Sequence, residues 1–236
     1  TGLAPWAQLL SWRSLPLGVQ RSTEAIELAG RHGWTDEPVT GLAYLALGVA
    51  EVIQGRLADA ERSVERAERT LRAEVEPAAG MRLHLGRGML ELARGRYPEA
   101  LAAIGTAERL ATLLVTEHTL GRRGRSHRLQ VLVRTGETER VERILAGMDG
   151  AERDSGEMRI ALAGLRLVQG DPDAATAALA PVVDGTIPLA SAHLWVVHAF
   201  WLDAIARDAA GDAAAARRAL EHALDLAAPE GLLYPF

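Results

Sequence analysis

The sequence lacks several residue types, and each absence removes a class of chemistry. Its 236 residues include no cysteine, which excludes disulfide frameworks and thiolate metal sites and fits a reducing compartment. All 26 basic residues are arginine, so the chain has neither a Schiff-base amine nor the lysine of a P-loop. Asparagine is absent as well, and a GC-rich genome that avoids lysine and asparagine codons is the ordinary explanation for both absences.

Long apolar runs and an excess of positive charge are also missing. No stretch approaches the roughly 18 apolar residues of a membrane span, so no membrane partner is expected. The formal net charge of -5 argues against direct nucleic-acid binding by this chain, because such affinity rests on a basic face. With 48% hydrophobic residues the chain has ample material for a core, and we expect a cytoplasmic protein.

The sequence does contain an internal repeat. The stretch 48–67, GVAEVIQGRLADAERSVERA, has a second copy at 88–107, GMLELARGRYPEALAAIGTA, with six of twenty positions identical. Each copy reads as a helix, a Gly-Arg turn and a second helix, whose small residues allow antiparallel packing at about 8–10 Å. A hairpin of this size cannot bury its apolar stripe alone, so stacked hairpins are predicted. The identical pairs are Gly48/Gly88, Glu51/Glu91, Gly55/Gly95, Arg56/Arg96, Ala60/Ala100 and Ala67/Ala107.

Turn glycines extend this pattern along the chain. They stand at 55, 95, 136, 170 and 211, separated by 40, 41, 34 and 41 residues, and Asp171 and Asp212 follow the last two as helix N-caps. We predict an all-α fold, a right-handed α-solenoid of tetratricopeptide-like hairpins in a single domain over 1–236, and a fragment of a longer chain. One imperfect helix over 1–19, in which Trp6 and Trp12 pack, and a helix over 20–32 precede the clear repeats. These cover about 38–72, 77–114, 116–148, 152–183 and 188–227, with loops at Asp149-Gly150 and Ser155-Gly156.

Enzyme signatures are missing, and we predict no catalysis and no cofactor. There is no HExxH, GxSxG, Walker A or dinucleotide-binding sequence. His193 and His198 are about 140° apart on a helix, so no metal site is predicted there. Carboxylates alternate with arginines on the second helix of each hairpin, as over Glu61–Arg69, which is typical of a solvated face with i, i+4 pairs and gives no sign of function. An enzyme is the weakest of the alternatives.

One basic cluster rises above this background. It is GRRGRSHR over 121–128, in the leading helix of the third repeat, where the other repeats are mostly apolar. Three interpretations stay open: a solvated and loosely helical surface, an anion or polar-ligand site in the groove, and a nucleic-acid contact. The last is weakened because no aromatic residue is interleaved for base stacking.

The spacing of small residues resembles the tetratricopeptide repeat, with Leu129, Val141 and Met148 as departures in the third copy. The stretches 25–69 and 219–236 further resemble the helical-repeat region of the large ATP-dependent LuxR-family transcription activators (MalT-like). This resemblance implies a sensor region that relays an inducer or protein signal to a flanking ATPase and a helix-turn-helix module. Both modules are expected outside this chain.

A ligand is expected on the concave face, which leading helices line in a stacked array. A small-molecule inducer predicts a closed polar pocket around Arg123, His127 and Trp201, whereas a scaffold for a partner peptide predicts a long open groove. Trp201 either stacks on a ligand or packs between repeats. The candidate ligand-binding residues are Arg82, Arg123, His127, Gln130, Arg134, Glu157, His198, Trp201 and Asp208.

Overall fold

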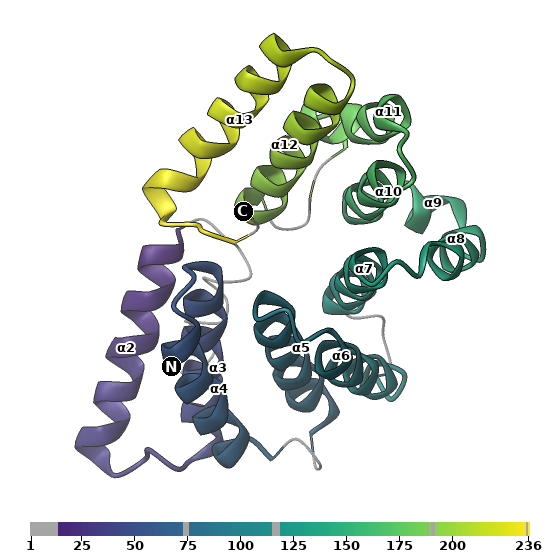
Figure 1. The fold of residues 1–236 in the computed structure, drawn as a ribbon. Helices are drawn as coiled ribbons and strands as arrows, with labels where there is room; N and C mark the ends of the chain where they lie inside the picture. Colours follow the sequence, from purple (N-terminus) through teal and green to yellow (C-terminus); the bar gives the residue numbers. More distant parts are fainter. Residues whose placement is uncertain (1–13, 73–75, 115–118, 188, 190–191, 235) are drawn as a thin grey trace. The chain divides into compact units, whose positions relative to one another are not determined.

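The protein is built from helical hairpins, as a computed structural model shows (Figure 1). It describes residues 14–236 except 73–75, 115–118, 188, 190–191 and 235; the expected packing of Trp6 and Trp12 lies outside these residues. Within them there are twelve α-helices, one short 3-10 helix and no strand. The α-helices are α2 Leu15–His32, α3 Pro38–Ile53, α4 Leu57–Thr70, α5 Pro77–Ala93, α6 Tyr97–Ala111, α7 Thr119–Arg134, α8 Thr138–Ala146, α9 Gly150–Arg153, α10 Gly156–Val168, α11 Pro172–Val183, α12 Ala192–Ala209 and α13 Ala213–Ala227.

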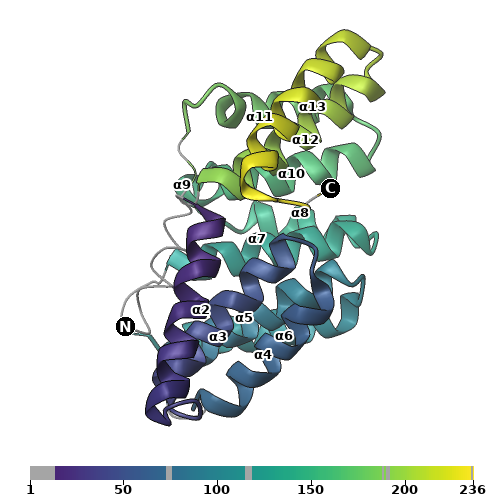
Figure 2. The ribbon, with the colours of Figure 1, turned by 90° about the vertical axis from the view of Figure 1, so that its left-hand side faces the viewer.

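The chain divides into two compact units. Unit 1 comprises Thr1–Arg125 with Glu230–Tyr234, and unit 2 comprises Ser126–Pro229 with Pro235–Phe236. Within unit 1, Figures 1 and 2 show α2 beside α3, which forms a hairpin with α4. Within unit 2, α10 packs on α11 and α12 on α13. The repeats run through both units, and the single-domain organisation stays a prediction.

The turn glycines predicted from the sequence all adopt the left-handed conformation. The φ angles of Gly55, Gly95, Gly136, Gly170 and Gly211 lie between 72° and 84°. In each turn the next residue donates its N–H to the carbonyl five residues back, at 2.8–2.9 Å, which closes the helix end. A side chain with a Cβ disfavours this φ, so glycine recurs at these sites. The predicted N-caps are also confirmed, because the Asp171 and Asp212 carboxylates accept from Ala174 N and Ala215 N.

Apolar side chains from successive hairpins share one core in each unit. In unit 1, Val52, Ala60 and Val64 from the first copy of the internal repeat cluster with Leu90 from the second. In unit 2, one cluster spans α10, α11 and α12 and includes Ile160, Leu179 and Trp195. Because neighbouring hairpins bury this apolar surface together, a single hairpin could not bury it alone.

Close approach explains the glycines that the two copies share at the middle of the leading helix. A Cβ on Gly48 would lie 2.9 Å from Val64 Cγ2, and one on Gly88 would lie 2.7 Å from Ile104 Cγ1. Both distances are shorter than carbon atoms tolerate without movement. Glycine therefore sets how closely each leading helix packs on its trailing helix.

Gly88→Ala is expected to lower the free energy of unfolding by about 1 kcal/mol, because overpacking costs about 1–3 kcal/mol and alanine returns about 1 kcal/mol of helix propensity. Gly105→Ala in α6 is the matched control, since the nearest atom to its Cβ would be Arg109 Nη1 at 3.9 Å. That substitution should stabilise the protein. Urea unfolding midpoints give both values, and stabilisation by both substitutions would show that Gly88 does not limit packing.

Acidic residues of α4 connect hairpins, which corrects the interpretation of that helix as a solvated face with local pairs. Arg87 of α5 pairs with Glu61 at 2.6 Å and with Glu68 at 2.8 Å, and Arg94 also pairs with Glu61. Only Arg69 with Glu65, at 3.9 Å, is an i, i+4 pair of the expected kind in this stretch. The charges that alternate along α4 thus face the next hairpin as well as solvent.

The identical Glu51/Glu91 and Arg56/Arg96 pairs form the same ion pair in both copies. Each arginine lies 3.5 Å from the corresponding glutamate, which is buried at the end of its leading helix. Ser63 Oγ also donates to Glu51, at 2.7 Å. Burial raises the pKa of Glu51, and these donors counteract that rise.

Two predicted boundaries differ from the structure. Helix α2 begins at Leu15, with Ser14 Oγ accepting from Leu17 N, so the predicted break between residues 19 and 20 is wrong; its end at Gly33 is confirmed. The predicted loop at Asp149-Gly150 ends one residue earlier, because Asp149 lies between α8 and α9 and its carboxylate accepts from Glu152 N, which starts α9 at Gly150. In both places a side-chain cap fixes where the helix begins.

Candidate functional site

The candidate site lies in unit 2, on three leading helices. They are the part of α7 from Ser126 onward, α10 and α12. Ser126 Oγ donates to the carbonyl oxygen of Glu157 at 3.0 Å, a buried bond that ties α7 to the start of α10. Helices α10 and α12 share the apolar core of this unit. The backbone that carries the site is therefore fixed by packing and by this bond.

A row of rings follows one face of α12. Trp195, His198 and Trp201 are spaced three residues apart, so each ring lies beside the next on the helix surface, and the outer two are about 120° apart. The ring centroids are 6.2 Å apart for Trp195 and His198 and 5.7 Å apart for His198 and Trp201. His127 of α7 continues the row at 5.2 Å from Trp195. Three of these rings are buried and Trp201 is half-buried, so the row ends at the surface.

A pocket of about 240 Å³ opens at that end of the row. Most of its walls are aliphatic, and Val168 and Ile205 are exposed at 55% and 39%. Its polar side chains are Gln130, His198 and the exposed Arg134. The full lining is Gln130, Val133, Arg134, Ile160, Ala161, Gly164, Leu167, Val168, His198, Trp201, Leu202 and Ile205.

The electrostatics of the pocket centre on a neutral imidazole. Burial first, and then the charges of Arg134 and His127, together lower the pKa of His198 from 6.5 to about 3. At neutral pH, His198 is thus uncharged and can donate one hydrogen bond and accept another. The Gln130 carboxamide has the same two capacities, and the Arg134 guanidinium can pair with an anion.

This arrangement suits binding of a molecule with an apolar body and a few polar atoms. Ligand pockets are mostly apolar with a small number of placed polar groups, and the aromatic face of Trp201 adds a surface for a flat or ring-shaped group. In the part of the chain that the structure describes, no group of three or more histidines and carboxylates could hold a metal ion.

The structure brings together four of the nine predicted ligand-binding residues: Gln130, Arg134, His198 and Trp201 line the pocket. His127 contacts the Trp195 ring instead, and the buried Glu157 accepts from Ser126 through its carbonyl oxygen. Asp208 is exposed near the end of α12 and does not line the pocket, while Arg82 and Arg123 belong to unit 1.

The pocket differs from the closed polar pocket around Arg123, His127 and Trp201 that a small-molecule inducer was expected to need. Of the three residues only Trp201 lines the pocket, and the walls are largely aliphatic. Trp201 packs against the core cluster of unit 2, which is the packing role considered for it, and it also borders the pocket, where stacking on a ligand stays a prediction. The side chain of His193, considered with His198 as a metal pair, lies outside the described residues.

The basic cluster over 121–128 is not a solvated surface, which removes one of its three interpretations. Arg123, Ser126 and His127 are buried, and a Cβ on Gly124 would lie 2.9 Å from Leu85 Cδ2. Arg122 is the exposed residue of the cluster. The stretch is instead part of a packed helix.

The sequence interpretation missed Trp195, which is the centre of the ring row. The signal that could have found it is the three-residue spacing of Trp195, His198 and Trp201, which places each ring beside the next on the helix surface. It also missed the buried Asp203, which accepts from Arg207 Nε at 2.7 Å. Both lie in the largely apolar helix α12, where the apolar pattern makes individual polar roles hard to recognise.

Comparison with known proteins decides the family. The sequence model of the family described as the MalT-like TPR region matches residues 10–236. The chain belongs to this family. The resemblance inferred from the stretches 25–69 and 219–236 is confirmed, and this MalT-like TPR region carries its pocket on leading helices of its repeats.

A solved structure supports the fold of the MalT-like TPR region. The crystal structure of BtubC (BKLC) from P. vanneervenii is similar with a TM-score of 0.55 and 16% identity, over 94% of this chain and 94% of that one. At this identity the likeness shows the fold alone, and the predicted all-α helical-repeat fold is confirmed. No curated protein matches the sequence. Among the described helices, none has the length and apolar character needed to cross a membrane.

Proposed function

We propose that this MalT-like TPR region is the signal-sensing and interaction domain of a LuxR-type transcription regulator acting in the cytoplasm. It receives its signal at the pocket on α7, α10 and α12 and relays it to ATPase and DNA-binding modules outside this chain. It performs no catalysis of its own. The observation that carries the proposal is the pocket itself, which gathers Gln130, Arg134, His198 and Trp201 from two of these leading helices over an apolar floor.

The inducer class follows from the same residues. A neutral imidazole and a carboxamide suit hydroxyl or amide groups, the half-buried Trp201 suits the apolar face of a ring, and exposed Arg134 suits an anionic end. The volume of about 240 Å³ limits the part of the ligand that enters the pocket to a small molecule.

A partner peptide is the second candidate, and the exposed Val168 and Ile205 favour it. They place aliphatic surface beside the mouth of the pocket, where an apolar side chain of a peptide could be buried. In that case the domain is a tetratricopeptide scaffold without a small-molecule ligand.

Thermal unfolding of the protein with sugars, amino acids and small anions tests the proposal. A ligand at ten times its Kd raises the free energy of unfolding by about 1.4 kcal/mol, and Arg134→Gln and Trp201→Ala should each reduce that gain. The matched control is Arg140→Gln on the neighbouring α8, which is exposed and outside the pocket. A stabilisation that all variants retain places the ligand elsewhere. No stabilisation by any compound, with a cooperative unfolding transition, favours the peptide scaffold.

A further inference from the structure

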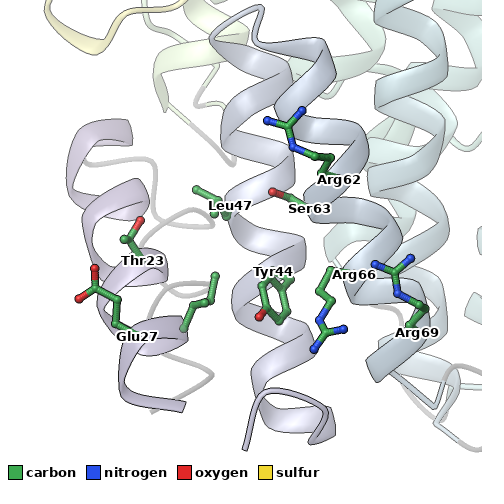
Figure 3. A pocket seen from close by; sticks show the side chains of 9 residues that line it. Thr23, Glu27, Tyr44, Leu47, Arg62, Ser63, Arg66 and Arg69 are labelled. Atoms are coloured by element: carbon green, nitrogen blue, oxygen red, sulfur yellow. The ribbon is translucent and has the colours of Figure 1, made fainter. Parts of the chain in front are cut away.

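A second cleft lies in unit 1, between α2 and α4 with α3 at its base (Figure 3). Its volume is about 350 Å³. In Figure 3, Thr23 and Glu27 come from α2, Tyr44 and Leu47 from α3, and the basic side chains from α4. The cleft shares no residue with the pocket in unit 2, so the two sites are separate.

The base of the cleft is apolar. Ile26, Tyr44 and Leu47 line it and are half-buried, so each keeps a contact surface open to a ligand. The Arg66 guanidinium lies 5.7 Å from the centre of the Tyr44 ring, a cation–π contact that holds the arginine beside the apolar base. Ser63 is occupied by Glu51 and adds no free group. The base therefore offers burial for apolar side chains.

One wall of the cleft is a row of arginines. Arg62, Arg66 and Arg69 follow one another at spacings of four and three residues, so they share one face of α4 over about 10 Å. Their acidic partners in the chain are Asp59, Asp36 and Glu65; the pairs of Arg62 and Arg69 are exposed, and Arg66 is half-buried opposite the exposed Asp36. Exposed ion pairs contribute little to stability, so a ligand carboxylate can replace them at small cost.

We propose that this cleft binds an extended acidic segment of a partner polypeptide. Side chains two residues apart on an extended chain point the same way and are about 7 Å apart, close to the rise of about 6 Å between Arg62 and Arg66. Carboxylates at alternate positions meet the arginine row, and the intervening apolar side chains meet Tyr44 and Leu47. The residues that line the cleft include three arginines and one carboxylate, that of Glu27.

The net charge of the whole chain makes the basic cleft more selective for its peptide. With a formal net charge of -5 the chain as a whole repels an acidic peptide, so attraction must come from a local basic surface. The cleft combines that local charge with an apolar base. A purely basic surface would bind any polyanion, whereas this site also demands apolar side chains at alternate positions.

Fluorescence anisotropy with a fluorescein-labelled peptide of sequence Ser-Glu-Leu-Glu-Leu-Glu-Ser tests the proposal. We expect saturable binding that weakens as salt increases, and about tenfold weaker binding by Arg62→Glu/Arg69→Glu. Both arginines are exposed, so this variant should fold normally. The control Arg140→Glu/Arg217→Glu makes the same change in net charge on α8 and α13 and should bind like the unmodified protein. Arg134→Gln, in the other pocket, should also leave binding unchanged.

Control peptides separate the two parts of the site. Replacing the glutamates with glutamine should abolish binding, and replacing the leucines with serine should weaken it about tenfold. The proposal is overturned if the first peptide does not bind, or if the two double variants lose the same amount of affinity for it. It is also overturned if the serine peptide binds as tightly as the first peptide, which would mean attraction by charge alone.

Discussion

Replacing Arg87 with methionine is expected to lower the free energy of unfolding by about 2 kcal/mol, although methionine keeps most of the apolar stem. The Arg87 side chain is 17% exposed, and its guanidinium reaches three carboxylates, at 2.6 Å to Glu61, 2.8 Å to Glu68 and 3.3 Å to Glu91. Glu91 is 7% exposed, so the loss of a partner leaves it poorly solvated. Chemical unfolding monitored by circular dichroism gives the value.

Two further variants identify the cause of this loss. Arg217→Met removes an arginine that is 80% exposed and pairs within α13, so it should have a much smaller effect. Glu91→Gln in the Arg87→Met background should cost less than Glu91→Gln alone, because the two residues interact directly. Equal effects of Arg87→Met and Arg217→Met would mean that the pairs across the hairpins add nothing to stability.

The turns of the fold were predictable because one residue fixes each of them. A glycine that needs positive φ, followed by a capping aspartate in the later repeats, specifies where a leading helix ends, as at Gly170 and Asp171. The pairing of Arg87 with Glu61 was not predictable in this way. Periodicity shows that the α4 charges lie on a polar face, but only the packing of α5 against α4 shows which of them meet a neighbour.

The helices that carry the candidate site were predictable from the sequence, but which of the predicted residues lie together was less predictable. Gln130, Arg134, His198 and Trp201 follow from the rule that leading helices carry the binding face, and all four line one pocket. Arg123 lies on the same helix as Gln130, yet the two residues fall in different compact units. A repeat pattern does not encode which residues of one helix belong to which compact unit. The ring row behind the pocket, centred on Trp195, depends on that packing too.

Acidification should destabilise unit 2 through His198. The unfolded imidazole takes up a proton as the pH falls through 6.5, whereas burial in the folded protein lowers the pKa of His198 to about 3. The unfolded state therefore binds more protons in this window, so folding stability falls as the pH falls. We expect a loss of about 2 kcal/mol from this residue between pH 7 and pH 5, and a further loss of about 1.4 kcal/mol for each unit down to pH 3.

The groups around His198 act in the same direction. Arg134 and His127 both oppose a positive charge on the imidazole, and the rings of Trp195 and Trp201 limit access of water to it. The raised pKa of Glu51 acts in the opposite sense, since a folded carboxyl that holds its proton more tightly favours folding at low pH. Glu51 is unchanged in a His198 variant, so its contribution cancels when slopes are compared.

His198→Gln isolates this effect, because the variant retains a polar group that does not titrate. Between pH 7 and pH 5, the variant should lose about 2 kcal/mol less free energy of unfolding than the unmodified protein loses. His222→Gln is the control in the same unit, since His222 is exposed and lies against Phe200. Comparing the slopes of the free energy of unfolding against pH removes any loss of stability that repacking causes equally at every pH. Identical slopes for His198→Gln and the unmodified protein would mean that the folded protein protonates His198 as readily as the unfolded chain does, and that the pocket holds a charged imidazole.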